Sequence, residues 1–182
     1  MESKKRPLKK EELPEAIPYI EDTSVLASPL IIGKRTAANR ICYQPMEGCD
    51  GTRDGAPDEL TKRRYMRFAR GGAGLIWFEA TAVVPEGRAN PRQLMLTEEN
   101  ADEFAALVAD IKEECLKENG FLPLIVCQLT HSGRWSKPDG APRPLVAYHR
   151  TPMEKNGPLN EDAILSDEYL DTLSEHYLHS AR

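Results

Sequence analysis

Two short apolar runs, Gly74–Phe78 and Leu122–Gln128, constrain the fold of this chain more than any other feature. The first run is apolar at every position, and the second repeats the pattern with Pro123 near its beginning. Such runs lack the alternation of a strand with one face in water, and they are typical of strands buried on both faces of a parallel sheet. We therefore expect an α/β protein.

Segments with helical periodicity precede each of these runs. Asp58 is the predicted cap of a helix that ends at Gly71-Gly72. A second helix is predicted to begin at Thr97 and to end at Asn119-Gly120. The apolar residues of each helix share one face: Thr61, Tyr65, Phe68 and Ala69 in the first, and Phe104, Leu107, Val108, Ile111 and Cys115 in the second. With an earlier strand over Ile41–Gln44, two βαβ units follow in succession.

Further elements are expected on both sides of these units. A hairpin is predicted over Leu30–Thr36, and a long loop from Thr130 to Leu165 precedes a helix capped by Ser166. This last helix meets no stop signal before Arg182. We therefore expect a truncated gene product or a piece of a longer chain.

Composition and charge narrow the class of protein. The 182 residues are 40% apolar and include 24 basic and 29 acidic side chains, for a net charge of −5, which favours one globular domain and disfavours binding to nucleic acid. No apolar run approaches the ~20 residues of a membrane span. We expect a cytoplasmic protein without a membrane association, with reduced cysteines and a flexible N-terminal arm over residues 1–27.

In β/α folds the residues that follow the carboxyl ends of the strands build the functional site. Here these residues are Gln44–Glu47, Glu79–Thr81 and Gln128–His131. None of them forms a glycine-rich phosphate loop or a nucleophile elbow. The Gln128 carboxamide offers an acceptor and two donors in one plane, which suits an imide edge such as the pyrimidine end of a flavin, although a bond to nearby backbone is the simpler alternative.

The motifs at these strand ends and turns also have a recognisable order. They are Leu30–Gly33, Asn39–Ile41 before Pro45-Met46, Gly71–Ile76 before Glu79–Thr81, Gly87-Arg88 and Gln128–Arg134. This set resembles the Old Yellow Enzyme family of NADH:flavin oxidoreductases, or ene-reductases, over about residues 28–182. The resemblance implies a (β/α)8 TIM barrel that binds FMN, takes hydride from NADH or NADPH and reduces an activated alkene or a similar small-molecule substrate.

The resemblance also assigns roles to particular residues. It implies that the flavin is lined by Gln44, Pro45, Met46 and Glu47, by the backbone of Ala80, and by Gln128, whose carboxamide bonds the pyrimidine portion. Backbone N–H groups near the ring would stabilise the negative charge of reduced flavin. His131 and Arg134 are expected to brace their loop rather than to contact substrate.

Two positions depart from the family pattern. Glu47 stands where members often have Thr or Cys, and a carboxylate near the flavin would disfavour the anionic reduced form and lower its reduction potential. Cys49 stands near a position where some members have Tyr, so an acid role for that loop does not carry over.

The chain supplies about three of the eight strands, whereas a complete barrel needs ~250 residues. In the family, the pair that holds the substrate carbonyl, the proton-donating Tyr and the phosphate-binding glycines lie beyond the point corresponding to Arg182. We therefore expect residues 28–182 to form the N-terminal part of an FMN-binding TIM barrel, a partial (β/α)8 fold made of a hairpin and about three parallel strands with their helices. We expect it to have no catalytic residue, no iron–sulfur cluster and no activity by itself.

Two other interpretations remain open. The chain could be a non-catalytic remnant that binds a protein partner through open sheet edges, and such edges could also lead to self-association or to completion of the barrel by a second chain. A metal-binding module is the third reading, because His176 and His179 share a helix face and could be joined by His131 or His149.

Overall fold

The computed structural model describes residues 22–154 and 159–182, so most of the predicted N-terminal arm lies outside the described residues. The last residues of that arm form a helical turn. Helix α1 (Ser24–Ala27) forms a single turn, and the Leu26 carbonyl accepts a hydrogen bond from Arg40 N at 2.9 Å. This contact ties the turn to the chain that leads into the main sheet, so the first element begins before residue 28.

A small antiparallel sheet follows α1. Strands β1 (Leu30–Ile32) and β2 (Arg35–Ala37) pair in the register Leu30↔Ala37, as the predicted hairpin requires. Gly33 has a φ of 59° at the turn, a left-handed conformation that glycine adopts without a Cβ penalty. The predicted hairpin is confirmed.

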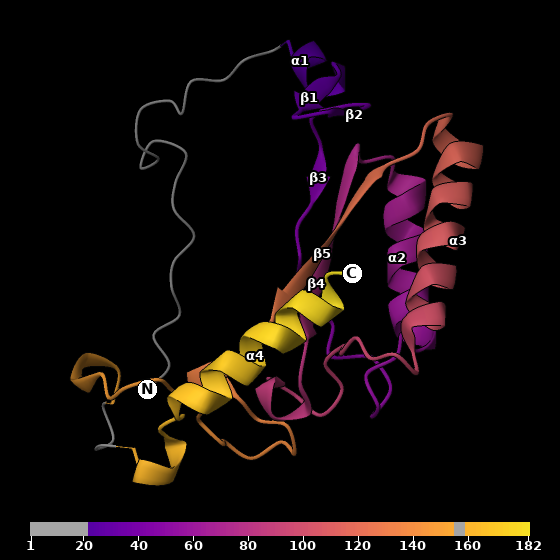
Figure 1. Ribbon diagram of the computed structural model, residues 1–182. Helices are drawn as coiled ribbons and strands as arrows, with labels where there is room; N and C mark the ends of the chain where they lie inside the picture. The colour runs from indigo at the N-terminus through magenta and orange to yellow at the C-terminus, as the bar shows by residue number, and fades with distance from the viewer. Residues whose placement is uncertain (1–21, 155–158) are drawn as a thin grey trace, which may run out of the picture.

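The main sheet has three parallel strands in chain order. They are β3 (Cys42–Tyr43), β4 (Leu75–Ala82) and β5 (Leu124–Thr130). The crossovers are α2 (Glu59–Gly71) and α3 (Ala101–Asn119), which lie side by side and cover one face of the sheet (Figure 1). The two predicted βαβ units are therefore confirmed.

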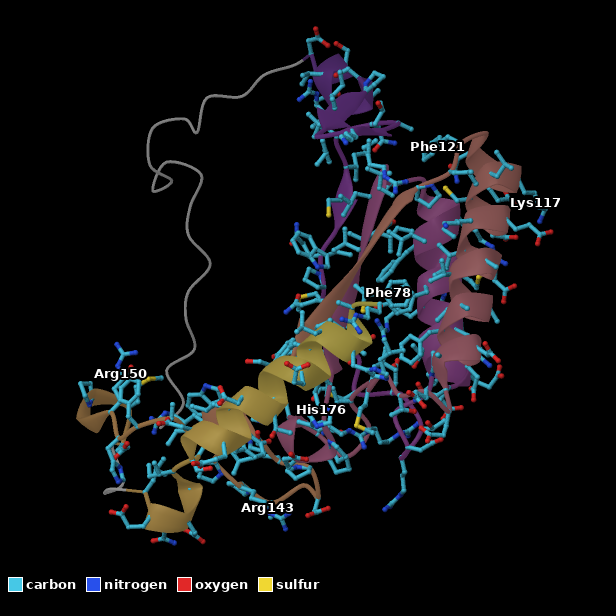
Figure 2. All side chains as sticks on the ribbon, viewed as in Figure 1. Phe78, Lys117, Phe121, Arg143, Arg150 and His176 are labelled. Carbon is cyan, nitrogen blue, oxygen red and sulfur yellow. The ribbon has the colours of Figure 1, made fainter. Side chains whose placement is uncertain are left out.

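The core lies between this sheet and the two helices. The Tyr65 and Phe78 rings stack with their centroids 4.1 Å apart, and Figure 2 shows Phe78 between the strands and α2. Ile76 from β4 and Ile111 from α3 are fully buried beside them. Burying such side chains contributes about 1.5–3 kcal/mol each, so this layer holds the sheet and helices together.

The helix ends follow the predicted signals, with one exception. Asp58 Oδ1 accepts a hydrogen bond from Glu59 N at 2.7 Å, and Gly72 ends α2 in a left-handed conformation. The second helix begins at Ala101, not at Thr97 as predicted. The reason is a turn in which Asn100 Oδ1 accepts a hydrogen bond from Thr97 N at 2.9 Å, so the segment from 97 to 100 is not helical.

The opposite face of the sheet is open in this chain. Trp77 on β4 and Val126 on β5 are 39% and 37% exposed, although the apolar runs predicted strands buried on both faces. The prediction is wrong at these two positions, because α2 and α3 both cover the other face; nearer the carboxyl end of β4, Ala80 and Ala82 are buried. The apolar composition is that of a strand whose second face meets other strands, as in a barrel interior.

The segment after β5 is irregular. It contains the short 3-10 turns η3 (Gly133–Trp135), η4 (Thr151–Met153) and η5 (Glu161–Ala163), and an isolated parallel bridge pairs Val146 with Ile164. Another 3-10 turn, η2 (Pro85–Gly87), follows β4. Helix α4 (Asp167–Ser180) is capped by Ser166 Oγ as predicted, at 3.2 Å from Tyr169 N. Among the described residues, no helix has the length and apolar character needed to cross a bilayer.

Candidate functional site

The three predicted strand-end segments meet at one edge of the main sheet. Ala80 pairs with Gln128 across β4 and β5. Tyr43 pairs with Ile76, so Gln44 comes next to the register position of Trp77. Tyr43 and Ile76 pack against the helical layer, and alternation along a strand therefore directs Gln44 to the open face. Gln128 lies on that same face, opposite in direction to Ile125 of the core.

The predicted site residues differ in their exposure. Ala80 is 6% exposed, whereas Met46 is 74% exposed. Pro45 and Gln128 are half-buried, and Gln44 and Glu47 are exposed. The structure thus gathers all six residues at the carboxyl edge of the sheet, with polar and apolar groups both accessible. Their role in flavin binding stays a prediction.

The backbone at Ala80 is held by a buried glutamine, Gln93, that no sequence motif singled out. Gln93 Nε2 donates to the Ala80 carbonyl at 2.9 Å, and Gln93 Oε1 accepts from Ala89 N at 2.6 Å. Gln93 is fully buried, so both hydrogen bonds form away from water. The strand end is therefore held by the loop that follows it.

Arg88 joins that loop to the one after β3. Its guanidinium donates to the carbonyls of Arg53 at 2.7 Å, of Pro91 at 2.8 Å and of Gln93 at 2.6 Å. Arg88 is only 5% exposed, and this burial lowers its pKa. The resemblance contained the Gly87-Arg88 pair, and the structure gives its physical basis: one buried side chain binds three backbone carbonyls in two loops.

Glu79 lies in a predicted strand-end segment, but sequence reasoning gave it no role. It is 1% exposed, and its Oε1 accepts from Arg64 Nη2 at 2.6 Å while its Oε2 accepts from Gly48 N at 2.8 Å. The Tyr65 hydroxyl also lies 3.3 Å from Oε1. A charged residue at the end of an otherwise apolar run was the available signal, because a carboxylate is rarely buried without partners.

A bulge in β4 brings Glu79 to this position. Between two paired positions β4 advances three residues, from Trp77 to Ala80, while β5 advances two, from Val126 to Gln128. The extra residue lets Phe78 and Glu79 both face α2, and it returns Ala80 to the open face.

Arg64 carries the positive charge of this cluster. Its Nη2 lies 2.8 Å from Asp50 Oδ1 and 2.6 Å from Glu79 Oε1. Burial would lower the pKa of Arg64, but the two carboxylates outweigh it and the pKa is raised. Burial would likewise raise the pKa of Asp50, but hydrogen bonds from Arg64 and Thr61 lower it. Both groups therefore remain charged at neutral pH.

In the loop after β3, the pKa values of Glu47 and Cys49 shift in the direction opposite to that of Asp50. Desolvation and the Glu79 carboxylate raise the pKa of Glu47, against a smaller opposing effect of Cys49. Desolvation and the nearby carboxylates also raise the pKa of the Cys49 thiol. Cys49 has a φ of 48°, a left-handed conformation that is uncommon for a residue other than glycine. The pKa values of Glu47 and Cys49 are therefore both raised, in contrast to that of Asp50.

His131 and Arg134 make the bracing contacts predicted for them. His131 Nδ1 accepts from Gly133 N at 3.0 Å, and burial lowers the pKa of this histidine. Arg134 Nη1 pairs with Glu154 Oε1 at 3.3 Å. A further contact joins α4 to this region, since the Tyr169 hydroxyl donates to Glu86 Oε1 at 2.6 Å.

The structure gives no support to the metal-binding module. His149 pairs with Glu154 at 3.2 Å, and His179 lies 3.0 Å from Glu98 on another part of the surface. Within residues 22–154 and 159–182 no group of three or more potential ligand side chains is arranged to hold a metal ion. The four histidines therefore do not converge.

Comparison with known proteins gives the class and then the family. The fold resembles that of an old yellow enzyme homologue from Zymomonas mobilis, with a TM-score of 0.64 and 25% identity over 84% of this chain and 42% of that one. It also resembles morphinone reductase in complex with tetrahydroNAD, with a TM-score of 0.65 and 23% identity over 86% of this chain and 45% of that one. The fold is thus part of a TIM barrel, and the predicted fold class is confirmed.

The family follows from the sequence match. The NADH:flavin oxidoreductase / NADH oxidase family matches residues 25–180, and the chain belongs to this family. An NADPH dehydrogenase from Geobacillus sp. (strain WCH70) is 38% identical over 139 residues, which cover 72% of this chain and 38% of that enzyme. The chain therefore spans well under half of the length of the curated relatives that it matches. FMN and NADH or NADPH, the predicted cofactors, are those of the family.

Proposed function

We propose that this chain forms the flavin-binding N-terminal wall of an FMN-dependent NAD(P)H oxidoreductase that reduces activated alkenes or similar acceptors. The observation that carries the proposal is the convergence of Gln44, Ala80 and Gln128 on one face at the carboxyl edge of the sheet. In β/α barrels this is the edge at which active sites lie.

The residues present suit the shape and polarity of a flavin. Its ring system is a flat, largely apolar plate with one imide edge, and the carboxyl edge of the sheet offers both an exposed apolar side chain, Met46, and the half-buried Gln128 carboxamide. A carboxamide can donate to and accept from an imide edge in one plane. Ala80 is small, and its carbonyl is already held by Gln93, so a planar group can approach the backbone closely.

The chemistry supplied by FMN, when bound, is hydride transfer between a reduced nicotinamide and an acceptor. The residues of this chain would bind and orient the ring: Gln128 at the pyrimidine portion, and Gln44 to Glu47 along the loop after β3. The Glu47 carboxylate would lower the reduction potential of the ring by opposing added negative charge. No residue of this chain is proposed to donate a proton to the acceptor.

Turnover would need the remaining strands of the barrel. The chain spans 38% of the Geobacillus relative, and a complete barrel has eight strands in ~250 residues. We therefore propose that the 182-residue chain alone does not reduce acceptors, and that reduction requires the rest of the barrel.

A flavin titration tests this function. Purified chain is mixed with FMN and passed through gel filtration while visible absorbance is followed. We expect FMN to elute with the protein, and we expect Gln128→Leu to weaken FMN binding about tenfold because one hydrogen-bonded edge is lost. Lys117→Gln, on the outer side of α3 in Figure 2, is the matched surface control and should bind FMN like the unmodified chain. Equal FMN binding by Gln128→Leu would contradict the assignment.

A second candidate function is favoured by the open sheet face. The exposed Trp77 and Val126 side chains are apolar, and uncovered strands of this kind associate with other polypeptides. In this interpretation the chain is a non-catalytic partner-binding protein. The same gel filtration separates the two functions: a concentration-dependent elution volume without bound FMN would favour partner binding over flavin chemistry.

A further inference from the structure

The segment over residues 44–47 is tied to β4 at both of its ends. On one side Tyr43 pairs with Ile76 of β4. On the other side Gly48 N donates to the Glu79 carboxylate of the same strand at 2.8 Å. Between these two points the segment makes a tight turn, in which Met46 N donates to the Gln44 carbonyl at 2.8 Å. The path of the four residues therefore depends on the Glu79 contact.

The two oxygens of Glu79 must both accept hydrogen bonds. Oε1 faces the Arg64 guanidinium at 2.6 Å, and Oε2 faces Gly48 N. A glutamine has one acceptor oxygen and one NH2 group that only donates. Whichever way its amide turned, the NH2 would face another donor, either Gly48 N or Arg64. An ionised carboxylate is therefore the group that satisfies both neighbours.

The choice of residue at position 48, on the loop side of this contact, is restricted as well. A Cβ at Gly48 would collide with the Arg64 guanidinium. That guanidinium is also held by Asp50 Oδ1 at 2.8 Å, so it cannot move aside without losing an ion pair. Glycine at position 48 allows the loop to approach Arg64 and Glu79 closely.

We propose that Glu79 is a positioning residue of the candidate site, which fixes residues 44–47 beside Ala80 by accepting the Gly48 N–H. Its effect on flavin binding rests on the proposed function, whereas its hold on the loop concerns this chain alone. Glu79 itself faces α2, on the covered side of the sheet, and acts through the loop rather than by touching a ligand.

The test combines hydrogen exchange with flavin binding in the full chain. In Glu79→Gln we expect the Met46 and Gly48 amides, which are both hydrogen-bonded in the unmodified chain, to exchange at least tenfold faster while those of β5 keep their rates. If the unmodified chain binds FMN, we expect Glu79→Gln to raise the dissociation constant for FMN about tenfold to a hundredfold, as is common when a supporting residue is lost. We also expect the visible absorption band of the bound flavin to shift in this variant.

Two variants make the test specific. Glu114→Gln removes the ion pair with Arg70 between α2 and α3, and it should change neither the loop exchange nor the flavin spectrum. Gly48→Ala leaves the carboxylate and β4 unchanged but blocks the approach of the loop, so it should reproduce the faster exchange of the Met46 amide even if Glu79→Gln fails to fold.

The outcomes separate this proposal from the proposed function. If the unmodified chain binds no FMN, the proposed function fails, and the exchange rates alone decide whether Glu79 holds the loop. Unchanged loop exchange in Glu79→Gln or, if that variant does not fold, in Gly48→Ala overturns the proposal. Unchanged FMN affinity and spectrum in a variant whose loop exchanges faster also overturn it, because the loop would then not shape the site.

Discussion

The two faces of the main sheet carry similar apolar side chains but have opposite environments. On the face toward α2 and α3, Ile76 is fully buried and Phe78 is 2% exposed. On the other face Trp77 and Val126 are each more than a third exposed. Neighbouring residues of one strand thus differ because only one face meets helices. The comparison teaches that similar apolar side chains are buried where α2 and α3 cover the sheet, whereas Trp77 and Val126 on the opposite face stay exposed.

The largest expected effect contrasts two adjacent aromatic residues of β4. Phe78→Ala should lower the free energy of unfolding by about 3–5 kcal/mol, because it removes a ring stacked on Tyr65 and leaves a cavity. Trp77→Ala should cost less than about 1 kcal/mol, because its ring is 39% exposed. Urea denaturation of both variants measures the difference. Equal costs would mean that the inner face is covered in solution.

A smaller effect on stability is expected at the ion pair between Asp50, in the loop after β3, and Arg64 of α2. Asp50→Asn should lower the free energy of unfolding by about 1–2 kcal/mol at pH 7. Because folding lowers the pKa of Asp50 below its ordinary 3.8, this contribution is present above about pH 4 and is lost as the pH falls through the folded value. The cost of Asp50→Asn should therefore shrink in acid.

Urea denaturation across a pH series measures this dependence. Asp139→Asn is the control, since Asp139 pairs with Arg143 on the surface with both side chains more than 60% exposed. It should have no measurable effect at any pH. A cost for Asp50→Asn that stayed constant below pH 3 would contradict the ion-pair explanation.

The open face gives a prediction about association rather than folding. Val126→Asp should change the free energy of unfolding by less than about 1 kcal/mol, since Val126 is 37% exposed. If copies of the chain associate through this face, the charge should abolish concentration-dependent sedimentation. The matched variant Val25→Asp alters an exposed side chain of α1 and should leave sedimentation unchanged. Association that persisted in Val126→Asp would point to another surface.

The smallest expected effect concerns the reactivity of Cys49. Because its pKa is raised above the ordinary 9.0, its alkylation by iodoacetamide at pH 8 should be slower than that of a free cysteine. Glu47→Gln removes one of the negative charges that raise this pKa, and it should speed alkylation about twofold to fivefold. Peptide mass spectrometry identifies the modified thiol. An unchanged rate would show that Glu47 does not act on Cys49.

The sequence determined much of the local structure and the edge of the sheet at which the candidate site residues lie. Asp58 and Ser166 begin their helices because a short side-chain oxygen can accept a free N–H, and this requires only neighbouring residues. The parallel order of the strands followed from apolar runs joined by helices. Gln44, Ala80 and Gln128 could be assigned to one edge because the carboxyl ends of parallel strands coincide.

Only the tertiary structure decided which polar groups hold that edge together. Glu79 became an anchor because a bulge directs it toward Arg64, and its partner Gly48 lies 31 residues earlier in the chain. Gln93 and Arg88 likewise bind backbone carbonyls that no sequence pattern marks. Burial of the strands was predicted on both faces, yet it depends on whatever covers each face. Local patterns record the propensities of neighbouring residues, whereas buried hydrogen bonds and covered faces depend on which distant segments meet.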